Sequence, residues 1–243
     1  MNDARTMPSL APPARLLDQT YRAILDAICD GTLPPGERVT QEGIAQRLGV
    51  SRQPVGQALA QLKSQGFLRE TGRRGLVVAH LDPVFFKAIY ELRSAIEPAA
   101  ARLAAASMTE ENAEAGKLII REGKRALRSG ELHALVEADT RFHAYLYELS
   151  GNPLFSEVMG LYWNHLRRAM GEVLQAKDEA RAVWQQHEEI LEALAARDGS
   201  RAARLIQAHL DSAAERVLAV VESRADTDAR RKRSGKEQGS RKT

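Results

Sequence analysis

Three stretches of the sequence carry ionisable side chains on helix faces that are otherwise apolar. Asp139 and His143 are four residues apart, so on a helix both emerge from one face. His187 and His209 hold the same kind of position within two later apolar stripes. An unpaired buried carboxylate costs several kcal/mol, so these groups need partners. A divalent metal would satisfy all four with oxygen and nitrogen ligands, zinc first, with nickel, manganese or iron as alternatives.

A metal that accepts five or six ligands would keep positions open beside these four, and a carboxylate can fill them. An arginine nearby would complete such an anion site. We expect this role for Arg93 first, with Arg167 and Arg168 as further candidates. Two simpler explanations stay open: each histidine alone can bond a backbone carbonyl, and Arg93 can form an ion pair with Glu97 one turn along.

The elements that must position these residues are helices. From residue 83 onward, apolar residues recur at spacings of three and four, and Gly, Pro, Ser and Asn separate the segments. The pattern predicts an all-α bundle over residues 84–222. Its six expected helices cover residues 83–106, 110–128, 131–149, 153–176, 179–196 and 200–222.

The preceding part, residues 14–81, has a different pattern. Thr40 can cap a short helix that breaks at Gly49, and Ser51 can cap a third helix from residue 52 to 65. Two short β-prone runs follow, FLRET and LVVAH, joined across GRRG. This order predicts a winged helix-turn-helix domain, with the helix-turn-helix at about residues 40–59.

Such a domain reads DNA with the exposed face of its third helix. Arginine and glutamine can form paired hydrogen bonds with guanine and adenine edges, which favours Arg52, Gln53 and Gln57 as base readers. Arg73 and Arg74, at the tip of the wing, are expected to contact a minor groove or phosphates. The simpler alternative is a small helical domain with a solvated basic face.

Composition limits the protein class. The chain has 243 residues, of which 44% are hydrophobic and 28% charged, and Cys29 is its one cysteine. A disulfide framework is therefore excluded, no apolar run is long enough to cross a membrane, and we expect a cytoplasmic location. Residues 1–13 read as a disordered leader without the apolar core of a signal peptide. Residues 223–243 read as a disordered basic tail, and residues 224–243 hold eight Lys or Arg against three Asp or Glu.

The first domain resembles the winged helix-turn-helix domain of GntR-family bacterial transcription regulators. The similarity rests on Gly31, Leu33, Pro35 and Gly36, on the turn LGVSRQPV, on ALAQLKSQG and on Gly75. One departure is Gly56, where the family usually has an arginine that contacts DNA, followed by Gln57 in place of glutamate. The resemblance implies a homodimer bound to a short palindromic operator, with a half-site that differs from the usual one.

The helical part resembles the FCD effector-binding domain of FadR-type GntR regulators. The similar motifs are ELRSAIEPAAARLAA, the spacing of Asp139 and His143, SGNP, QHEEIL and AHL. Six helices favour the smaller, VanR-like form. The resemblance implies that Asp139, His143, His187 and His209 ligate a divalent metal, as matching positions do in many members, and that the domain mediates dimerisation.

We therefore expect a ligand-responsive repressor of a catabolic operon, modulated by a small organic acid or sugar acid, and no enzymatic activity. Two alternatives remain open. The first is a metal-free FCD regulator that senses a larger ligand such as an acyl thioester. The second is a metal-dependent helical-bundle enzyme, which would need a general base that the sequence does not reveal.

Overall fold

The computed structural model describes residues 14–72, 75–174 and 176–240, with the side chains of Ala14, Glu172 and residues 225–240 left out. The chain divides into two compact units, Met1–Ala79 and His80–Thr243. The predicted leader over residues 1–13 and the last three residues lie outside the described residues. Within the described part, none of the helices combines the length and the hydropathy that a membrane crossing requires.

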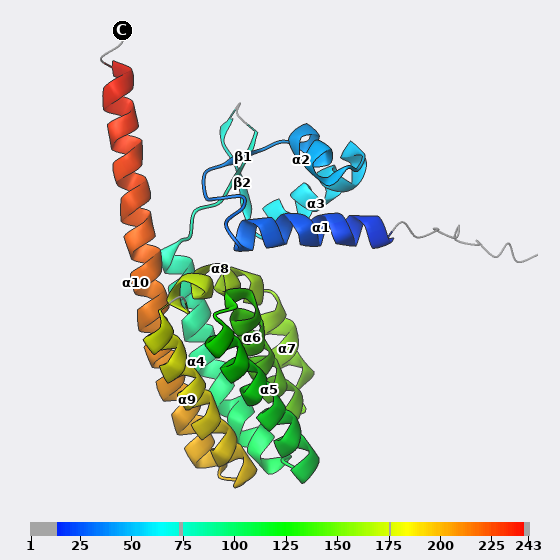
Figure 1. Cartoon of the computed structure of the whole chain (residues 1–243), viewed down its shortest axis with the longest axis vertical. Helices are drawn as coiled ribbons and strands as arrows, with labels where there is room; N and C mark the ends of the chain where they lie inside the picture. Colours follow the sequence, from blue (N-terminus) through cyan, green and yellow to red (C-terminus); the bar gives the residue numbers. More distant parts are fainter. Residues whose placement is uncertain (1–13, 73–74, 175, 241–243) are drawn as a thin grey trace, which may run out of the picture. The chain divides into compact units, whose positions relative to one another are not determined.

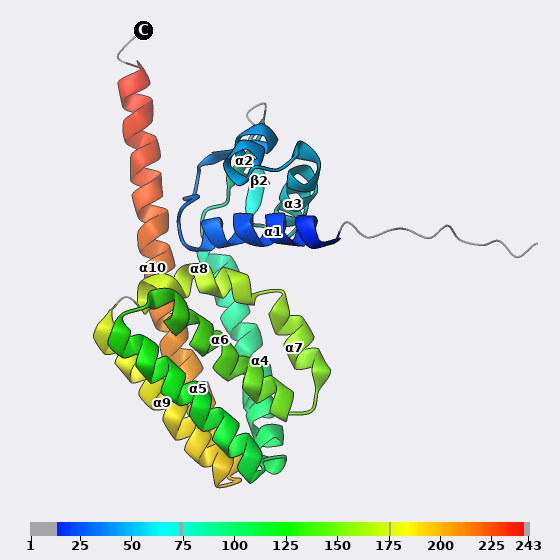
Figure 2. The ribbon, with the colours of Figure 1, turned by 45° about the vertical axis from the view of Figure 1, so that its right-hand side comes forward.

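The first unit is a winged helix-turn-helix, as the sequence predicts (Figure 2). Its strands form one antiparallel sheet in the order β1-β3-β2, with β2 and β3 as the expected hairpin. The two-residue β1 was not expected, and it pairs with the other edge of β3. The elements are α1 (Ala14–Cys29), β1 (Arg38–Val39), α2 (Gln41–Leu48), α3 (Arg52–Ser64), β2 (Leu68–Glu70) and β3 (Leu76–Val78).

Local signals set the limits of the helix-turn-helix. The Thr40 hydroxyl accepts a hydrogen bond from the Gly43 amide at 3.0 Å and so caps α2. Gly49 ends that helix in the left-handed conformation, with φ of 65°, which only glycine adopts without strain. Ser51 occupies the N-cap position of α3, as predicted. Its side chain makes no capping hydrogen bond, so the prediction that this side chain caps the helix is wrong.

The second unit is a helical bundle in which α4, α5, α6, α9 and α10 run side by side and α8 lies across one end (Figure 1). Helix α4 packs along α10, and α5 packs against both α6 and α9. The helices are α4 (Pro83–Ala106), α5 (Glu110–Ser129), α6 (Leu132–Leu149), α7 (Pro153–Gly160), α8 (Trp163–Val173), α9 (Lys177–Ala195) and α10 (Gly199–Ser240).

Two expectations about this unit are corrected. The described residues form seven helices here, not six, because the helix expected over residues 153–176 bends after Gly160 into α7 and α8. At the bend, the amides of Leu161 and Tyr162 bond carbonyls three residues back, which tightens the turn and redirects the chain. The apolar spacing continues through the bend, so the sequence pattern conceals it. Six helices would have favoured the smaller, VanR-like form of the domain, and the seven observed helices do not.

The second correction concerns the tail. Helix α10 continues to Ser240, through most of the segment predicted to be disordered. Arginine and lysine are frequent there, and both have high helix propensity, so a helix already formed by packing can continue through them. Charge content alone was a poor guide to the backbone conformation.

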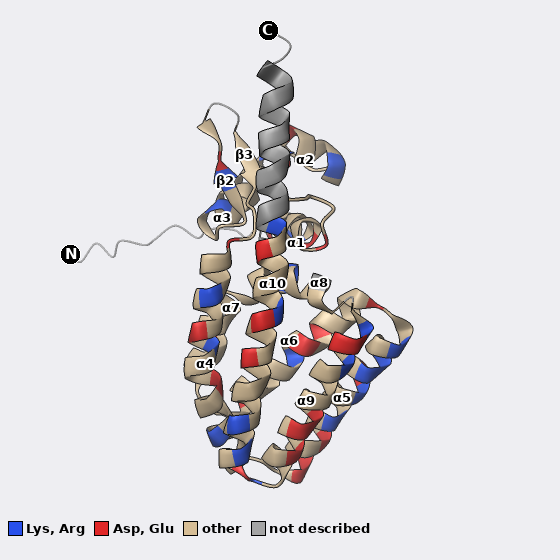
Figure 3. Ribbon diagram, turned by 90° about the vertical axis from the view of Figure 1, so that its left-hand side faces the viewer, with Lys and Arg blue, Asp and Glu red and all other residues tan. Residues whose placement is uncertain are grey.

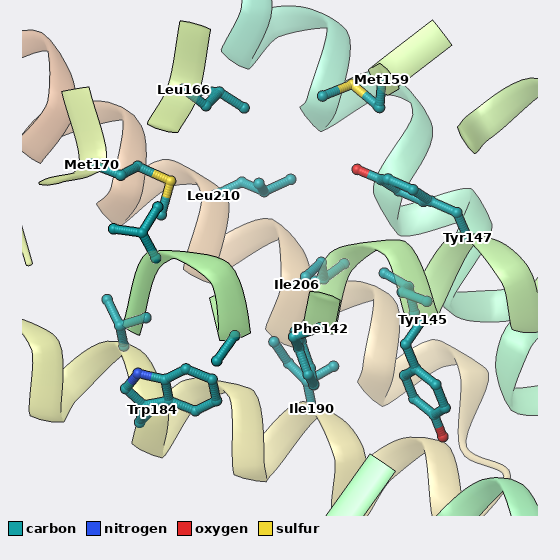
Figure 4. Packing of buried hydrophobic residues seen from close by; sticks show 14 of the residues in the cluster. Phe142, Tyr145, Tyr147, Met159, Leu166, Met170, Trp184, Ile190, Ile206 and Leu210 are labelled. Carbon is teal, nitrogen blue, oxygen red and sulfur yellow. The ribbon is translucent and has the colours of Figure 1, made fainter. Parts of the chain in front are cut away.

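The core of the bundle contains aromatic side chains from α6 and α9 (Figure 4). Phe142, Tyr145 and Tyr147 come from α6, and the Trp184 ring, which is 1% exposed, comes from α9. On the surface, basic residues gather on α5 and acidic residues on α9 (Figure 3). Lys124 and Glu188 join these two helices through an ion pair of 2.6 Å.

Candidate metal centre

Helices α6, α9 and α10 bring the four predicted ligands into the core of the bundle. The exposed fractions are 1% for both Asp139 and His143, 0% for His187 and 3% for His209. One nitrogen from each histidine lies within 4.8 Å of the others. Asp139 is adjacent, with its Oδ1 3.6 Å from His187 Nε2. The apolar stripes of three helices thus converge as the sequence predicts.

Several polar atoms at this point have no hydrogen-bond partner. Both carboxylate oxygens of Asp139 and both ring nitrogens of His187 are buried and unpartnered, among the few such atoms in the described part of the chain. Leaving a buried polar group unsatisfied costs about 1–3 kcal/mol, more if it is charged. The four residues form an N,N,N,O donor set of the kind that binds zinc and neighbouring transition metals, so the residues fit a divalent cation.

The surroundings favour the neutral forms of His187, His209 and Asp139. Burial lowers the pKa of His187 well below its ordinary value, and neighbouring His209 and His143 lower it further. Burial also lowers the pKa of His209 well below the ordinary value and raises the pKa of Asp139. Neutral imidazoles are the form that ligates metals, and a bound cation would favour the ionised form of Asp139.

Two of the histidines have side-chain partners at Nδ1. His143 Nδ1 lies 2.9 Å from Glu97 Oε2, and His209 Nδ1 lies 3.0 Å from Gln186 Oε1. These acceptors leave Nε2 of each ring for another partner. Sequence reasoning did not single out Glu97 or Gln186 for this role, although both belong to motifs of the FCD resemblance.

Arg93 lies inside the core beside these residues and is 1% exposed. Its Nε donates to Glu97 Oε1 at 2.6 Å, which is the ion pair left open as its alternative role. Its guanidinium carbon also lies 5.1 Å from the centre of the Tyr90 ring and 5.2 Å from that of Trp163. Burial alone would raise the pKa of Glu97, but Arg93 and His143 outweigh it and hold that pKa far below its ordinary value.

A small cavity adjoins the candidate ligands, with a volume of about 20 Å³. This is room for roughly one water molecule or a bare cation. Arg93 lines it, whereas the half-buried Arg167 and the buried Arg168 are not among its lining residues. Arg216 of α10 does line it, was not predicted, and has a buried, unpartnered Nη1. Its Nε is bonded to Glu179 of α9.

In the first unit, the predicted DNA-reading side chains of α3 are exposed. Arg52, Gln53 and Gln57 face solvent, whereas Val55 and Leu59 are buried in the core of the unit. Arg52 forms an ion pair with Glu42 at 2.8 Å. The wing residues predicted to contact DNA, Arg73 and Arg74, lie outside the described residues.

Gly56 is half-buried between these readers. A Cβ atom there would lie 3.0 Å from the Nε2 atom at the flexible end of Gln41. The fold can therefore accommodate a side chain at this position if Gln41 turns aside.

Comparison with known proteins finds one matching protein family for each of the two units. Residues 16–78 match the family model described as bacterial regulatory proteins, gntR family, and residues 88–212 match the FCD domain. The chain is 29% identical over 189 residues to the Nta operon transcriptional regulator of Aminobacter aminovorans, covering 77% of this chain and 87% of that protein. It is 25% identical over 217 residues to the HTH-type transcriptional repressor RspR of Escherichia coli, covering 89% and 95%.

Among solved structures, a putative transcriptional regulator GntR from Rhodococcus sp. RHA1 has the same fold, with a TM-score of 0.73 at 23% identity. The alignment covers 85% of this chain and 99% of that one. The matching families and relatives are transcription regulators and not enzymes, which removes the helical-bundle enzyme as an alternative. The chain belongs to the GntR family of bacterial regulatory proteins and is a DNA-binding transcription regulator with a C-terminal FCD domain.

Proposed function

We propose that this regulator represses a catabolic operon and that a small carboxylate effector, bound beside a divalent metal in the helical unit, modulates its DNA binding. The single observation that carries the proposal is the group of unpartnered atoms on Asp139 and His187, buried next to His143 and His209. A repressor role is supported by the likeness to RspR, a transcriptional repressor, and control of an operon by the likeness to the Nta operon regulator.

Asp139, His143, His187 and His209 would hold the metal, zinc first, with nickel, manganese or iron as alternatives. A bound divalent cation would supply positive charge to a buried site and so attract a carboxylate. Arg93 is the proposed partner of that carboxylate, and the unpaired Nη1 of Arg216 adds a second donor at the same cavity. Arg167 and Arg168 are weaker candidates because neither lines it.

The size of the cavity bears on which effector fits. A volume of about 20 Å³ does not hold a carboxylic acid unless the walls move apart, and an acyl thioester would need a far larger change. The walls include Met170 and Val173 of α8 and Arg216 of α10. Effector entry would therefore displace α8 relative to α10, which gives the helical unit two states that an effector can bias.

On the DNA side, we propose a homodimer that places two copies of α3 about one helical turn apart, roughly 34 Å, on a short palindromic operator. The exposed side chains of Arg52, Gln53 and Gln57 would read base edges. Arg73 and Arg74 of the wing are proposed to contact the minor groove or phosphates.

The proposal is tested by measuring DNA affinity with the full chain, using fluorescence anisotropy on a duplex selected from a random pool. Metal-stripped and zinc-loaded protein are each titrated with a panel of organic acids and sugar acids. We expect an acid to change the affinity of the loaded protein and to leave the stripped protein unchanged. Equal responses of the two forms would contradict the metal-dependent part of the proposal.

His187→Ala is the informative variant, because it removes a proposed ligand whose ring nitrogens have no hydrogen-bond partner. We expect it to abolish the response to the acid while DNA binding without effector persists. His133→Ala is the matched control, since His133 is exposed on α6, the same helix as His143. A normal response in the His187 variant would refute the metal-dependent sensor.

A further inference from the structure

Glu97 is a fully buried carboxylate, with an exposed fraction of 0%, on which three donors converge. Arg93 Nε donates to its Oε1 at 2.6 Å and the Tyr147 hydroxyl donates to the same oxygen at 2.8 Å. His143 Nδ1 lies 2.9 Å from the other oxygen, Oε2. The donors come from α4 and α6, so one carboxylate connects the arginine of the cavity to a candidate metal ligand.

This geometry assigns the proton on the His143 ring. A carboxylate paired with a buried guanidinium is ionised and can only accept hydrogen bonds, so His143 Nδ1 must carry the proton and donate. Arg93 Nη2 lies 3.2 Å from Nδ1 and 3.1 Å from Nε2 of the same ring. A protonated Nδ1 cannot accept, and a donor almost equidistant from the two ring nitrogens lies off the in-plane axis of the Nε2 lone pair, so that lone pair stays available for another partner.

We propose that Glu97 is the positioning residue of the metal centre. It holds His143 in the Nδ1–H tautomer, so that Nε2 is the ligand atom, and it anchors Arg93 beside the same ring. The inference rests on the metal site proposed above.

Replacing Glu97 with glutamine should reverse this arrangement. Arg93 and Tyr147 both donate to Oε1, so the amide oxygen stays with these two donors and the NH₂ group faces His143. The NH₂ group then donates to Nδ1 and forces the proton onto Nε2, which blocks the ligand atom. Glu97→Gln therefore preserves the shape of the side chain and inverts the tautomer.

The test is calorimetric titration of the full-length, metal-stripped protein with Zn²⁺. We expect Glu97→Gln to weaken Zn²⁺ binding about 10–100-fold, as loss of an orienting hydrogen bond to a metal-ligating histidine does. Tyr147→Phe is the matched control, because it removes a hydrogen bond to the same carboxylate and leaves His143 Nδ1 untouched. Its affinity should stay within about threefold of the unmodified chain. Equal affinity of Glu97→Gln and the unmodified chain would overturn the inference.

A second measurement does not require the glutamine variant to fold. In metal-free protein with ¹⁵N-labelled histidine, long-range proton–nitrogen spectra distinguish the two tautomers, and the spectrum of His143→Gln assigns the signal. We expect protonated Nδ1 on His143, and a protonated Nε2 would refute the role of Glu97. Failure of the unmodified chain to bind Zn²⁺ at all would instead refute the metal site, so the two failures are distinguishable.

Discussion

Gly123 allows α5 to approach α9 more closely than any other residue would. A Cβ atom at this position would lie 2.0 Å from the Cη2 atom of Trp184 and 2.2 Å from Cζ2. The Trp184 ring is 1% exposed and packs edge-on against His187, with ring centres 5.1 Å apart. We predict that Gly123→Ala destabilises the helical unit.

The magnitude follows from two opposing effects. To restore a carbon–carbon separation of about 3.5 Å, the indole or the helix must move by about 1.5 Å, and overpacking of a rigid core costs about 1–3 kcal/mol. Alanine gains about 1 kcal/mol over glycine within a helix. Because a contact of 2.0 Å is severe, the upper end of the packing cost applies, and the net loss should be about 2 kcal/mol.

Urea denaturation followed by tryptophan fluorescence measures this loss directly. The chain has two tryptophans, Trp163 and Trp184, and both belong to the unit from His80 to Thr243, so the signal reports on that unit alone. The matched control is Gly171→Ala in α8, where a Cβ would meet nothing within 4 Å. The control should gain about 0.5–1 kcal/mol. A Gly123 variant as stable as this control would refute the packing argument.

Three further predictions concern the cap, the DNA contacts and pH. Thr40→Ala should lower the stability of the first unit by about 1 kcal/mol, seen as faster hydrogen exchange in α2; unchanged exchange would contradict the cap. Gln57→Ala should weaken binding to the selected duplex by about 1–3 kcal/mol without changing the salt dependence, and an equal loss on random DNA would exclude base reading. In metal-free protein, burial lowers the pKa of His187 and His209, so below about pH 6.5 the unfolded chain binds more protons than the folded chain. Stability therefore falls as the pH is lowered, by about 1.4 kcal/mol per pH unit for each group. Asp139, whose pKa is raised, acts in the opposite direction, but it is one carboxyl against two imidazoles. Urea denaturation with chelator at pH 7.5 and 5.5 should therefore show lower stability at 5.5; equal or higher stability would contradict the assignment.

Much of the fold was predictable because its signals are local. Thr40 and Gly49 mark the ends of α2 through bonds that reach three or four residues along the chain. The bend between α7 and α8 was not predictable, because apolar residues at helical spacing continue through Gly160. A turn made by tertiary packing leaves no interruption in such a pattern.

The candidate site was predictable only in part. Helical periodicity placed Asp139, His143, His187 and His209 on inward faces, because spacing alone determines the face that a residue occupies. Arg216 was missed because its spacing resembles that of an ordinary surface arginine. Only the position of α10 beside α4 and α8 brings it to the cavity.

The sequence by itself determined which residues are buried in each helix and where most helices begin and end. Tertiary structure decided which buried groups meet: it pairs Glu97 with His143, 46 residues apart, and leaves the polar atoms of Asp139 and His187 without hydrogen-bond partners. The reason is physical. Helix formation and burial depend on neighbours within a few positions, whereas the partner of a buried charge depends on how separate helices pack, which local spacing does not encode.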